Sequence, residues 1–409
     1  MAPAGNFECL RAAIQGGADS VYFGVGHLNM RAHSAGNFSP ADLSEVVRIC
    51  REAGVRTYLT LNIVLYDEDL DAMRATLNRA REAGVSAVIA SDIAAIEYAR
   101  SIGMEVHIST QLNVSNLEAL RFYARWADVI VLARELNLDQ VRQLHERIVA
   151  EHITGPSGEP VRIEMFAHGA LCMAVSGKCY LSLHATGDSA NRGECLQICR
   201  RGYEVTDLET GYKLDIDNQY IMSPKDLCTI GFMDRIIASG VRVFKIEGRA
   251  RSAEYVRRTA SCYRRAADAV CAGTYTPELA AELKRQLGEV FNRGFWDGYY
   301  QGAKMGQWSS VYGSQATRRK VYCGKVSNWF DRLGVAEVTV ESVPLHLGDR
   351  VMAIGSTTGV VEFDVTDLRV NFAPVDCAAK GERCSVAVRT AENNDRLRRG
   401  DKIYIWQEV

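Results

Sequence analysis

The chain has 409 residues, 47% of them hydrophobic, with a formal net charge of −2 at pH 7 and an isoelectric point near 6.5. This length suits two domains with full-sized cores, one of which could be a barrel of about 250 residues. The balanced charge excludes a globally basic nucleic-acid-binding protein, and no apolar run approaches the roughly 20 residues that span a bilayer. With no signal peptide in the sequence, we expect a cytoplasmic protein without a membrane partner.

The first 270 residues alternate short β-rich runs with amphipathic helical segments. The predicted strands are Asp19–Gly24, Arg56–Asn62, Ser86–Asp92, Glu105–Asn113, Asp128–Ala133, Arg162–Gly169 and Arg242–Gly248. Predicted helices include Phe7–Gln15, Ser39–Ala53, Leu70–Ala83, Leu117–Trp126 and Asp139–Val149. An eighth strand is expected before the first helix, where only Met1–Gly5 stands, so the natural start could lie upstream. Apolar strands separated by single helices predict parallel β/α units. Eight units without a GxGxxG loop favour a (β/α)8 TIM-like barrel over residues 1–272.

The last third of the chain has a different sequence pattern, in which short alternating runs replace the β/α alternation. Over residues 273–316 we expect a helical pair, Thr274–Gly306, that closes the barrel, and then a linker. Six short alternating runs follow, at Tyr322–Asn328, Val335–Glu341, Arg350–Ile354, Gly359–Val365, Cys384–Val388 and Lys402–Trp406. Gly-Asp turns separate them, as in Leu347–Asp349 and Arg399–Asp401. This pattern predicts a small closed β-barrel over residues 317–409.

Four cysteines lie in a Gly-, Ser- and Asn-rich loop, residues 170–200, directly after the strand Arg162–Gly169. They are Cys172, Cys179, Cys195 and Cys199. Thiolates are soft ligands that favour zinc, copper(I) or iron–sulfur clusters. Their spacing is wider than the short CxxC pairs of common zinc sites, so an iron–sulfur cluster inserted in the barrel loop is our first choice and zinc the alternative.

Three other interpretations of these thiols remain open. A disulfide would conflict with the reducing-compartment pattern of the chain. A catalytic thiol would need a neighbouring base, and His168 and His184 are near in sequence. Inert burial is the plainest interpretation, and it is the one we expect for Cys9, Cys50, Cys262 and Cys271.

Polar residues gather at the carboxyl ends of the predicted strands, on the face that carries the active site in (β/α)8 enzymes. They are Asn62, Asp92, Ser109, Gln111, Asn113, Glu164, His168, Lys245, Glu247 and Arg249. Some could only cap the following helix, as we expect for Asp92 and Asn113. The set that we expect to function as a group is Gln111, Glu164, His168, Lys245, Glu247 and Arg249.

Linked motifs along nearly the whole chain resemble the peptidase U32 family, also called collagenase-like. They include Ala2-Pro-Ala-Gly-Asn6, Gly17-Ala-Asp-Ser-Val-Tyr22, Ser109-Thr-Gln111, Phe166-Ala-His-Gly-Ala-Leu-Cys172, Ser176-Gly-Lys-Cys179, Asn191-Arg-Gly-Glu-Cys195, Ser223-Pro-Lys-Asp-Leu227, Phe244-Lys-Ile-Glu-Gly-Arg249 and Phe291-Asn-Arg-Gly-Phe295. Within the family the chain looks closest to the tRNA hydroxylation protein P branch. The better-understood members are iron–sulfur proteins that hydroxylate tRNA, ribosomal RNA or ubiquinone precursors without free oxygen, with prephenate implied as the oxygen source.

The resemblance implies that Cys172, Cys179, Cys195 and Cys199 hold a [4Fe–4S] cluster. Quinone-pathway members take their last ligand from a cysteine further along, which makes Cys228 the fallback candidate here. The implied activity is RNA hydroxylation, with 5-hydroxyuridine in tRNA as the expected product and tRNA as the partner. The alternatives are a collagenase-like peptidase and a non-catalytic protein that carries a cluster or RNA. The chain contains no HExxH, GxSxG or papain-type signature, which counts against proteolysis.

Roles for individual residues follow from their chemistry. We expect Glu164, His168, Glu247 and Gln111 to be catalytic, the two carboxylates and the imidazole by moving protons. Arg192, Lys245, Arg249 and Asn62 are expected to bind an anionic substrate. A plainer role for Lys245 and Glu247 is a salt bridge that positions Arg249. Two basic runs, Arg200–Arg201 and Arg318–Lys320, are candidates for contact with the RNA backbone, together with the C-terminal barrel, although either run could be a solvated surface.

Overall fold

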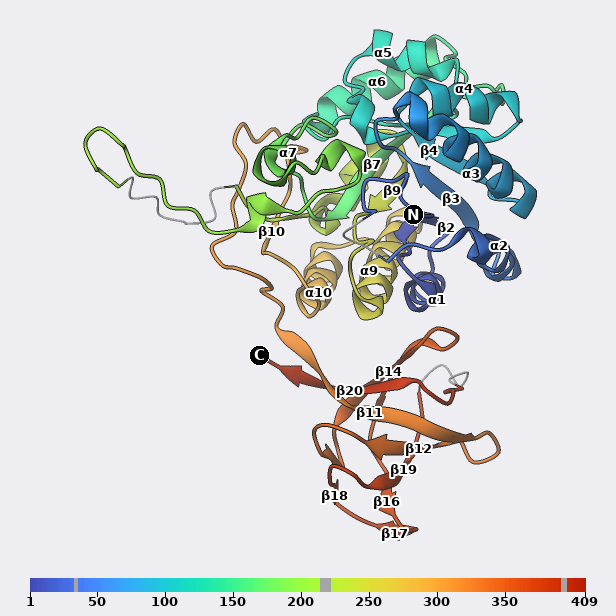
Figure 1. Cartoon of the computed structure of the whole chain (residues 1–409), viewed down its shortest axis with the longest axis vertical. Coiled ribbons are helices and arrows are strands. Elements are labelled where there is room, and N and C mark those ends of the chain that lie inside the picture. Colours follow the sequence, from blue (N-terminus) through green and yellow to red (C-terminus); the bar gives the residue numbers. More distant parts are fainter. Residues whose placement is uncertain (33–35, 214–221, 391–395) are drawn as a thin grey trace.

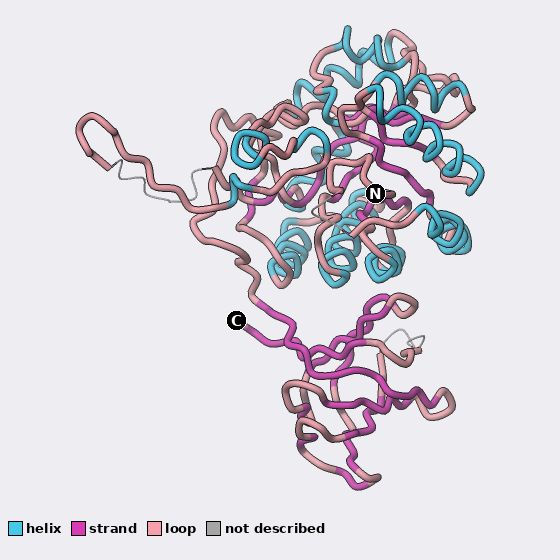
Figure 2. Tube along the Cα trace, in the orientation of Figure 1, coloured by secondary structure: helices cyan, strands magenta, loops and turns pink. Residues whose placement is uncertain are grey.

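The structure is a computed structural model that describes residues 1–32, 36–213, 222–390 and 396–409. A mainly parallel sheet with its helices occupies the N-terminal part, and an antiparallel sheet forms the C-terminal part (Figures 1 and 2). No helix within the described residues combines the length and the apolar character that crossing a membrane requires.

The N-terminal part alternates strands and helices as predicted. Its parallel strands are β1 (Ala2–Pro3), β2 (Ser20–Phe23), β3 (Arg56–Leu61), β4 (Ala87–Ala90), β5 (Glu105–Ile108), β6 (Val129–Val131), β7 (Arg162–Gly169) and β9 (Val241–Ile246). Its helices are α1 (Phe7–Gln15), α2 (Leu43–Glu52), α3 (Leu70–Ala83), α4 (Ile93–Ser101), α5 (Leu117–Ala124), α6 (Leu138–Ala150), α7 (Leu181–Thr186), α8 (Met233–Ala238), α9 (Ala253–Cys271) and α10 (Pro277–Gly288). β2, β4 and β6 are buried along their whole length, which explains their nearly continuous apolar sequences, whereas β9 has an exposed residue, Arg242.

Strand order in this sheet follows the sequence from β1 to β7, and β9 pairs with β7 in parallel. Two hydrogen bonds then join β9 to the start of the chain: the Met1 amino group donates to Phe244 O at 2.8 Å, and Ile246 N–H donates to Met1 O at 3.1 Å. The first and last parallel strands therefore lie side by side, as a (β/α)8 barrel requires. A closed barrel remains our interpretation of this sheet.

Local sequence signals account for several helix ends. The side chains of Asn6, Asp92, Asn116 and Asn137 accept hydrogen bonds from the first turns of α1, α4, α5 and α6. Asp92 is thus a helix cap, as expected. Asn113 is not, because it lies before Asn116 in a left-handed conformation with φ of +50°.

The predicted helical pair Thr274–Gly306 is wrong in its second half. Only α10 forms, and the chain then makes a short strand, β10 (Phe295–Trp296), that pairs with β8 (Asp226–Cys228). Gly294, at φ +77°, turns the chain into this strand, and the Asp226 carboxylate accepts from the backbone of Arg293. The pairing joins segments almost seventy residues apart, so helical periodicity could not reveal it.

All six strands predicted for the C-terminal part are present in an antiparallel sheet. They are β11 (Arg318–Phe330), β12 (Val335–Val340), β14 (Arg350–Gly355), β15 (Gly359–Asp364), β19 (Arg383–Ala387) and β20 (Lys402–Glu408). The shorter β16 (Leu368–Val370) and β17 (Ala373–Pro374) extend the sheet, and β13 (Leu345–His346) pairs with β18 (Cys377–Ala378). The antiparallel character is confirmed. Closure into a barrel remains a prediction, because the strand order runs between two ends, β15 and β17, within the described residues.

The C-terminal sheet packs beneath α1, α9 and α10 (Figure 1). Met352, Ile354, Val360 and Trp406 belong to the same hydrophobic cluster as these helices, while the rest of the sheet has a core of its own. Polar contacts reinforce the junction: Gln15 bonds to the backbone of β15, and Lys320 pairs with Glu254 at 2.9 Å. The two parts therefore share an extensive interface.

Candidate active site

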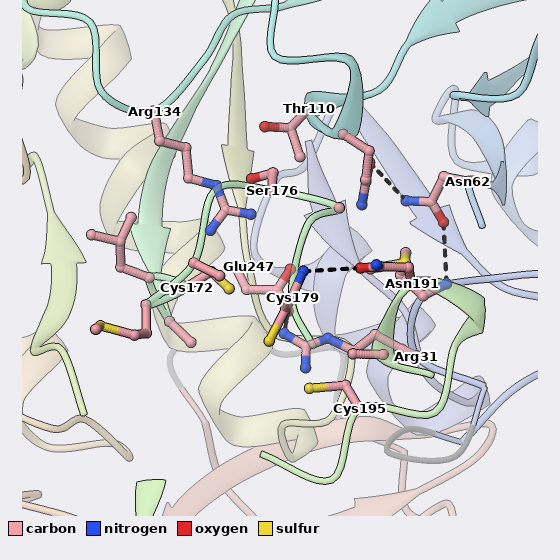
Figure 3. A pocket seen from close by; sticks show the side chains of 18 of the residues that line it. Arg31, Asn62, Thr110, Arg134, Cys172, Ser176, Cys179, Asn191, Cys195 and Glu247 are labelled. Atoms are coloured by element: carbon pink, nitrogen blue, oxygen red, sulfur yellow. Dashed lines mark hydrogen bonds and ion pairs between the residues drawn. The ribbon is translucent and has the colours of Figure 1, made fainter. Parts of the chain in front are cut away.

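A pocket with a cavity of about 150 Å³ lies at the carboxyl ends of the parallel strands. Side chains from the strand ends form its floor, and the segment that follows β7 covers it (Figure 3). The lining includes Tyr22, Thr60, Asn62, Gln111, Phe166, Lys245, Glu247 and Arg249. Of the polar strand-end residues singled out in the sequence, Asn62, Ser109, Gln111, Lys245, Glu247 and Arg249 line this pocket, and their functional roles stay predictions.

The cysteine-bearing segment is anchored on the strand ends by backbone contacts. Gly177 has φ of +72° and packs against Gln111 so closely that a side chain at position 177 would overlap it. The Asn113 amide donates to Ser176 O at 2.9 Å. Cys179 N–H donates to the Asn191 side chain at 3.3 Å (Figure 3). The positions of the thiols are therefore linked to the same residues that shape the floor.

All four predicted cysteine ligands line this one pocket: Cys172, Cys179, Cys195 and Cys199. Burial raises the pKa of Cys199; Arg200 opposes this shift, and the neighbouring thiols of Cys172, Cys195 and Cys179 add to it. Burial raises the pKa of Cys179 as well, again with a contribution from Cys172 and Cys195. Within the described residues, no group of three or more His, Cys, Asp or Glu side chains is arranged to hold a single metal ion.

The fallback ligand Cys228 lies elsewhere. It is buried in β8, accepts a long hydrogen bond from Tyr263 at 3.9 Å, and does not line the pocket. Burial raises its pKa to about 11. Cys228 therefore lies apart from the pocket that Cys172, Cys179, Cys195 and Cys199 line.

Two ion pairs lie at the floor of the pocket. Lys245 Nζ donates to Glu164 Oε1 at 2.9 Å, and both side chains are buried; Lys245 lines the pocket while Glu164 lies behind it. Arg31 donates to Glu247 Oε1 at 2.8 Å. Burial alone would raise the pKa of Glu247, but Arg31, Arg249 and Arg134 together lower it. The salt bridge expected for Lys245 and Glu247 therefore takes another form: Lys245 pairs with Glu164 of β7, and Glu247 pairs with Arg31 of the loop after β2.

The remaining predicted floor residues form hydrogen-bonded sets. The Arg249 guanidinium donates to Asn29 Oδ1 at 2.8 Å and Thr60 Oγ1 at 2.9 Å, and burial lowers its pKa to about 10. Asn62 donates to Gln111 Oε1 at 3.4 Å, and Ser109 contacts the same oxygen. Asn62, Ser109 and Gln111 are neutral and present amide and hydroxyl dipoles to a bound ligand.

His168 and Arg192 are not part of the pocket, although both were predicted site residues. His168 is enclosed by Tyr255, Tyr263 and Phe295, and burial lowers its pKa to about 3, so it is neutral and cannot exchange protons with a substrate. Arg192 donates to Asp69 at 2.8 Å and stacks on Tyr66. Its role is to hold the loop against the segment after β3.

Sequence reasoning missed two arginines of the pocket. Arg134 follows the strand Asp128–Ala133 directly, so the strand-end rule could have found it. Its guanidinium lies over the Phe166 ring at 4.5 Å and has no ion-pair partner among the described residues. Arg31 comes from the loop after β2, where no local pattern marks it. Both point into the pocket in Figure 3.

The basic runs proposed for RNA contact are largely engaged within the protein. Arg200 donates to Leu171 O, Pro224 O and Ser223 Oγ, which ties the cysteine segment together. Lys320 pairs with Glu254 of α9 and Arg318 with Glu408. Of the two runs, Arg201 and Arg319 are the exposed members.

Comparison with known proteins shows the family of the chain. A family model described as peptidase family U32 matches residues 5–310. The chain belongs to this family. A collagenase of Porphyromonas gingivalis is 58% identical over 404 residues, which cover 99% of this chain and 96% of that protein.

Relatives in the same family carry RNA-modification names. The tRNA hydroxylation protein P1 of Bacillus subtilis is 34% identical, covering 80% of this chain and 77% of that protein. A 23S rRNA 5-hydroxycytidine synthase of Escherichia coli is 37% identical, covering 66% of this chain and 39% of that protein. The U32 resemblance is therefore confirmed. The collagenase-named relative matches at higher identity than the tRNA hydroxylation protein whose branch the motifs favoured.

Proposed function

We propose that this U32 protein is an iron–sulfur-dependent RNA hydroxylase that forms 5-hydroxyuridine in tRNA and takes its oxygen from a carboxylic acid such as prephenate. The observation that carries the proposal is the meeting of four cysteines with Arg31, Arg134, Lys245 and Arg249 in one pocket. Thiols that can hold a redox centre thus share a cavity with cations that can hold an anionic substrate. The RNA-modification names of two relatives support the choice of substrate.

The cysteine set fits a cluster better than a single zinc ion. Four thiolates around one zinc ion lie about 3.8 Å apart, given Zn–S bonds of about 2.3 Å. All four thiols line one cavity, and their spacing in the sequence is wider than the CxxC pairs of common zinc sites. A [4Fe–4S] cluster distributes its four ligands over four irons, so its thiolates stand farther apart than those around one zinc ion. When bound there, it would supply one-electron chemistry beside the substrate.

The protein's own residues then bind and orient the reactants. Arg134 is the guanidinium best placed to take a carboxylate, because its donors are not used in an ion pair within the described structure. Asn62 and Gln111 can hydrogen-bond the polar edge of a pyrimidine. Lys245 can give or take a proton at its Nζ atom, and Glu247, paired with Arg31, remains ionised.

Two measurements test the proposal. Anaerobic purification should yield a brown protein with about four irons and four sulfides per chain, as a [4Fe–4S] cluster requires. Cys195→Ser should lose this iron, while Cys271→Ser, at an exposed cysteine outside the pocket, should keep it. A colourless protein that binds one zinc and no sulfide would refute the cluster. Mass spectrometry of tRNA nucleosides after gene deletion should show loss of 5-hydroxyuridine derivatives, and an unchanged profile would refute the RNA substrate.

Proteolysis is the second candidate, favoured by the name of the 58% identical relative. The pocket offers it little machinery, because no histidine lines it and no Cys–His pair is present there among the described residues. Gelatin hydrolysis that is lost in Arg134→Met and Glu247→Gln, but kept in a surface variant, would establish the peptidase instead.

A further inference from the structure

Four titratable side chains, those of Glu105, His107, Glu164 and Lys245, form a row inside the parallel sheet, which we call the buried row. Glu105 stands at the amino end of β5, and its carboxylate lies 3.0 Å from His107 Nε2. His107 Nδ1 lies 3.9 Å from Glu164 Oε2, and Glu164 Oε1 accepts from Lys245 at 2.9 Å. Lys245 lines the pocket near the carboxyl end of β9. The buried row therefore runs from the amino ends of the strands to their carboxyl ends.

The strand geometry explains how these residues meet. Glu105 and His107 are two residues apart on β5 and so share one face. Glu164 on β7 and Lys245 on β9 belong to paired strands, and both are almost fully buried. The interior of such a sheet is normally packed with branched apolar side chains. A row of charged groups there needs a specific explanation.

Within the buried row, two atoms have no hydrogen-bond partner: His107 Nδ1 and Glu164 Oε2. They are the atoms that face each other at 3.9 Å, about 1 Å beyond hydrogen-bond distance. A buried polar atom without a partner is destabilising, so two such atoms that face each other need an explanation. A gap that a small side-chain movement closes is suited to transfer of a proton.

The outer end of the buried row reaches solvent. The Glu105 side chain is 23% exposed and is held by Arg56 at 2.5 Å and Arg162 at 3.1 Å. Other titratable groups also face the buried row. The Tyr58 ring lies against His107, the Tyr22 ring lies beside Lys245, and the amino group of Met1 interacts electrostatically with Glu164.

We propose that Glu105, His107, Glu164 and Lys245 form a proton path between solvent at the amino ends of the strands and the pocket. An RNA base and an oxygen donor in the pocket would close its mouth to water, so protons would need a second route. The use of the path in catalysis rests on the proposed hydroxylase function, whereas the path itself rests on the geometry.

Each step moves one proton and no electrons. A basic atom of the bound reactants takes a proton from the Lys245 ammonium, which becomes a neutral amine. At the outer end, burial would raise the pKa of Glu105, but His107 and Arg56 lower it to about 2, so the ionised carboxylate first takes a proton from water. Glu105 passes this proton to His107 Nε2, and the imidazolium so formed gives its Nδ1 proton to the Glu164 carboxylate. The Glu164 carboxyl group turns and passes a proton to Lys245, and a turn of the His107 ring again presents an N–H to Glu164. The net result is one proton transferred from solvent to the pocket.

The path can be tested without any activity, by NMR of the full-length protein with labelled histidine. The His107 signal is assigned by its loss in His107→Gln. Lys245→Met should shift the His107 titration upward by at least one pH unit, because Glu164 loses its cation and then favours the imidazolium. The double variant Lys245→Met/Glu164→Gln should titrate at lower pH than the wild-type protein, because it lacks the nearby carboxylate that favours the imidazolium. The control His152→Gln, at an exposed histidine, should leave it unchanged. A His107 titration that is insensitive to both variants would overturn the proposal.

Use of the path is tested by tRNA hydroxylation. His107→Gln and Glu164→Gln should each lower kcat at least tenfold, raise the solvent deuterium isotope effect, and leave KM for tRNA within twofold. Full kcat with an unchanged isotope effect in both variants would show that the reaction does not draw on the path. If the wild-type protein hydroxylates no RNA, the proposed function fails, and the NMR titration still decides whether the groups are coupled.

Discussion

Gly359→Ala tests the junction between the two parts of the chain. Gly359 opens β15 at φ +73° and packs against α1, where an added Cβ would overlap Gln15 Oε1 and lie 2.9 Å from Arg11 Cβ. Gln15 bridges the junction, because its amide donates to Thr358 O and accepts from Val360 N–H, each at 2.9 Å. The methyl group must therefore displace the bridging amide.

Two contributions set the expected magnitude. An alanine in the left-handed region costs about 1–2 kcal/mol. Loss of the two Gln15 hydrogen bonds adds about 1 kcal/mol each. We expect Gly359→Ala to lower the free energy of unfolding by about 3–4 kcal/mol. Gly348→Ala is the matched control, because Gly348 has φ of +89° in the same sheet region and a Cβ there meets nothing within 4 Å. It should lose only the backbone contribution, about 1–2 kcal/mol.

Urea unfolding of the full-length variants at pH 7 measures both effects. Gln15→Ala in the Gly359→Ala background should add almost nothing, because its hydrogen bonds are already lost, whereas Gln15→Ala alone should be destabilising. Equal losses for Gly359→Ala and Gly348→Ala, with additive effects of Gln15→Ala, would refute the reasoning. The interface would then tolerate the methyl group without losing the bridge.

Three further predictions concern the site. Arg134→Met should weaken calorimetric binding of prephenate about 10- to 100-fold, the value of a charge-assisted hydrogen bond, without lowering stability; unchanged binding would place the anion elsewhere. Cys228→Ser should retain iron and sulfide, and their loss would restore Cys228 as a ligand. Burial lowers the pKa of His168 to about 3, so between pH 6.5 and about 3 the unfolded chain binds a proton at His168 that the folded protein excludes. As the pH is lowered through this range, the wild-type protein loses up to about 1.4 kcal/mol of stability per pH unit. His168→Gln should remove this contribution and so lose less stability over the same range. Parallel pH profiles of the two proteins would contradict this.

Local pattern was sufficient for most elements of this fold. Alternating β-rich and amphipathic segments predicted the parallel β/α arrangement, and Gly-Asp turns predicted the six main C-terminal strands. These signals are short-range, because side chains return to the same face every two residues in a strand and every 3.6 residues in a helix. The same logic placed four cysteines on a segment after β7 and polar side chains at strand ends. The structure brings the four cysteines and part of the polar set, without Glu164 and His168, into one pocket.

Only the tertiary structure decided which side chains face the cavity. His168 and Glu164 lie on the same strand, yet aromatic rings from α9 and β10 enclose the imidazole, and Lys245 from β9 takes the carboxylate. Arg31 enters from a loop without any periodic pattern, and β10 exists because β8 offers it a partner. Each of these outcomes depends on contacts between residues tens to hundreds of positions apart. The direction of a polar side chain at a strand end is set by such distant neighbours, and the sequence around it carries no signal of them.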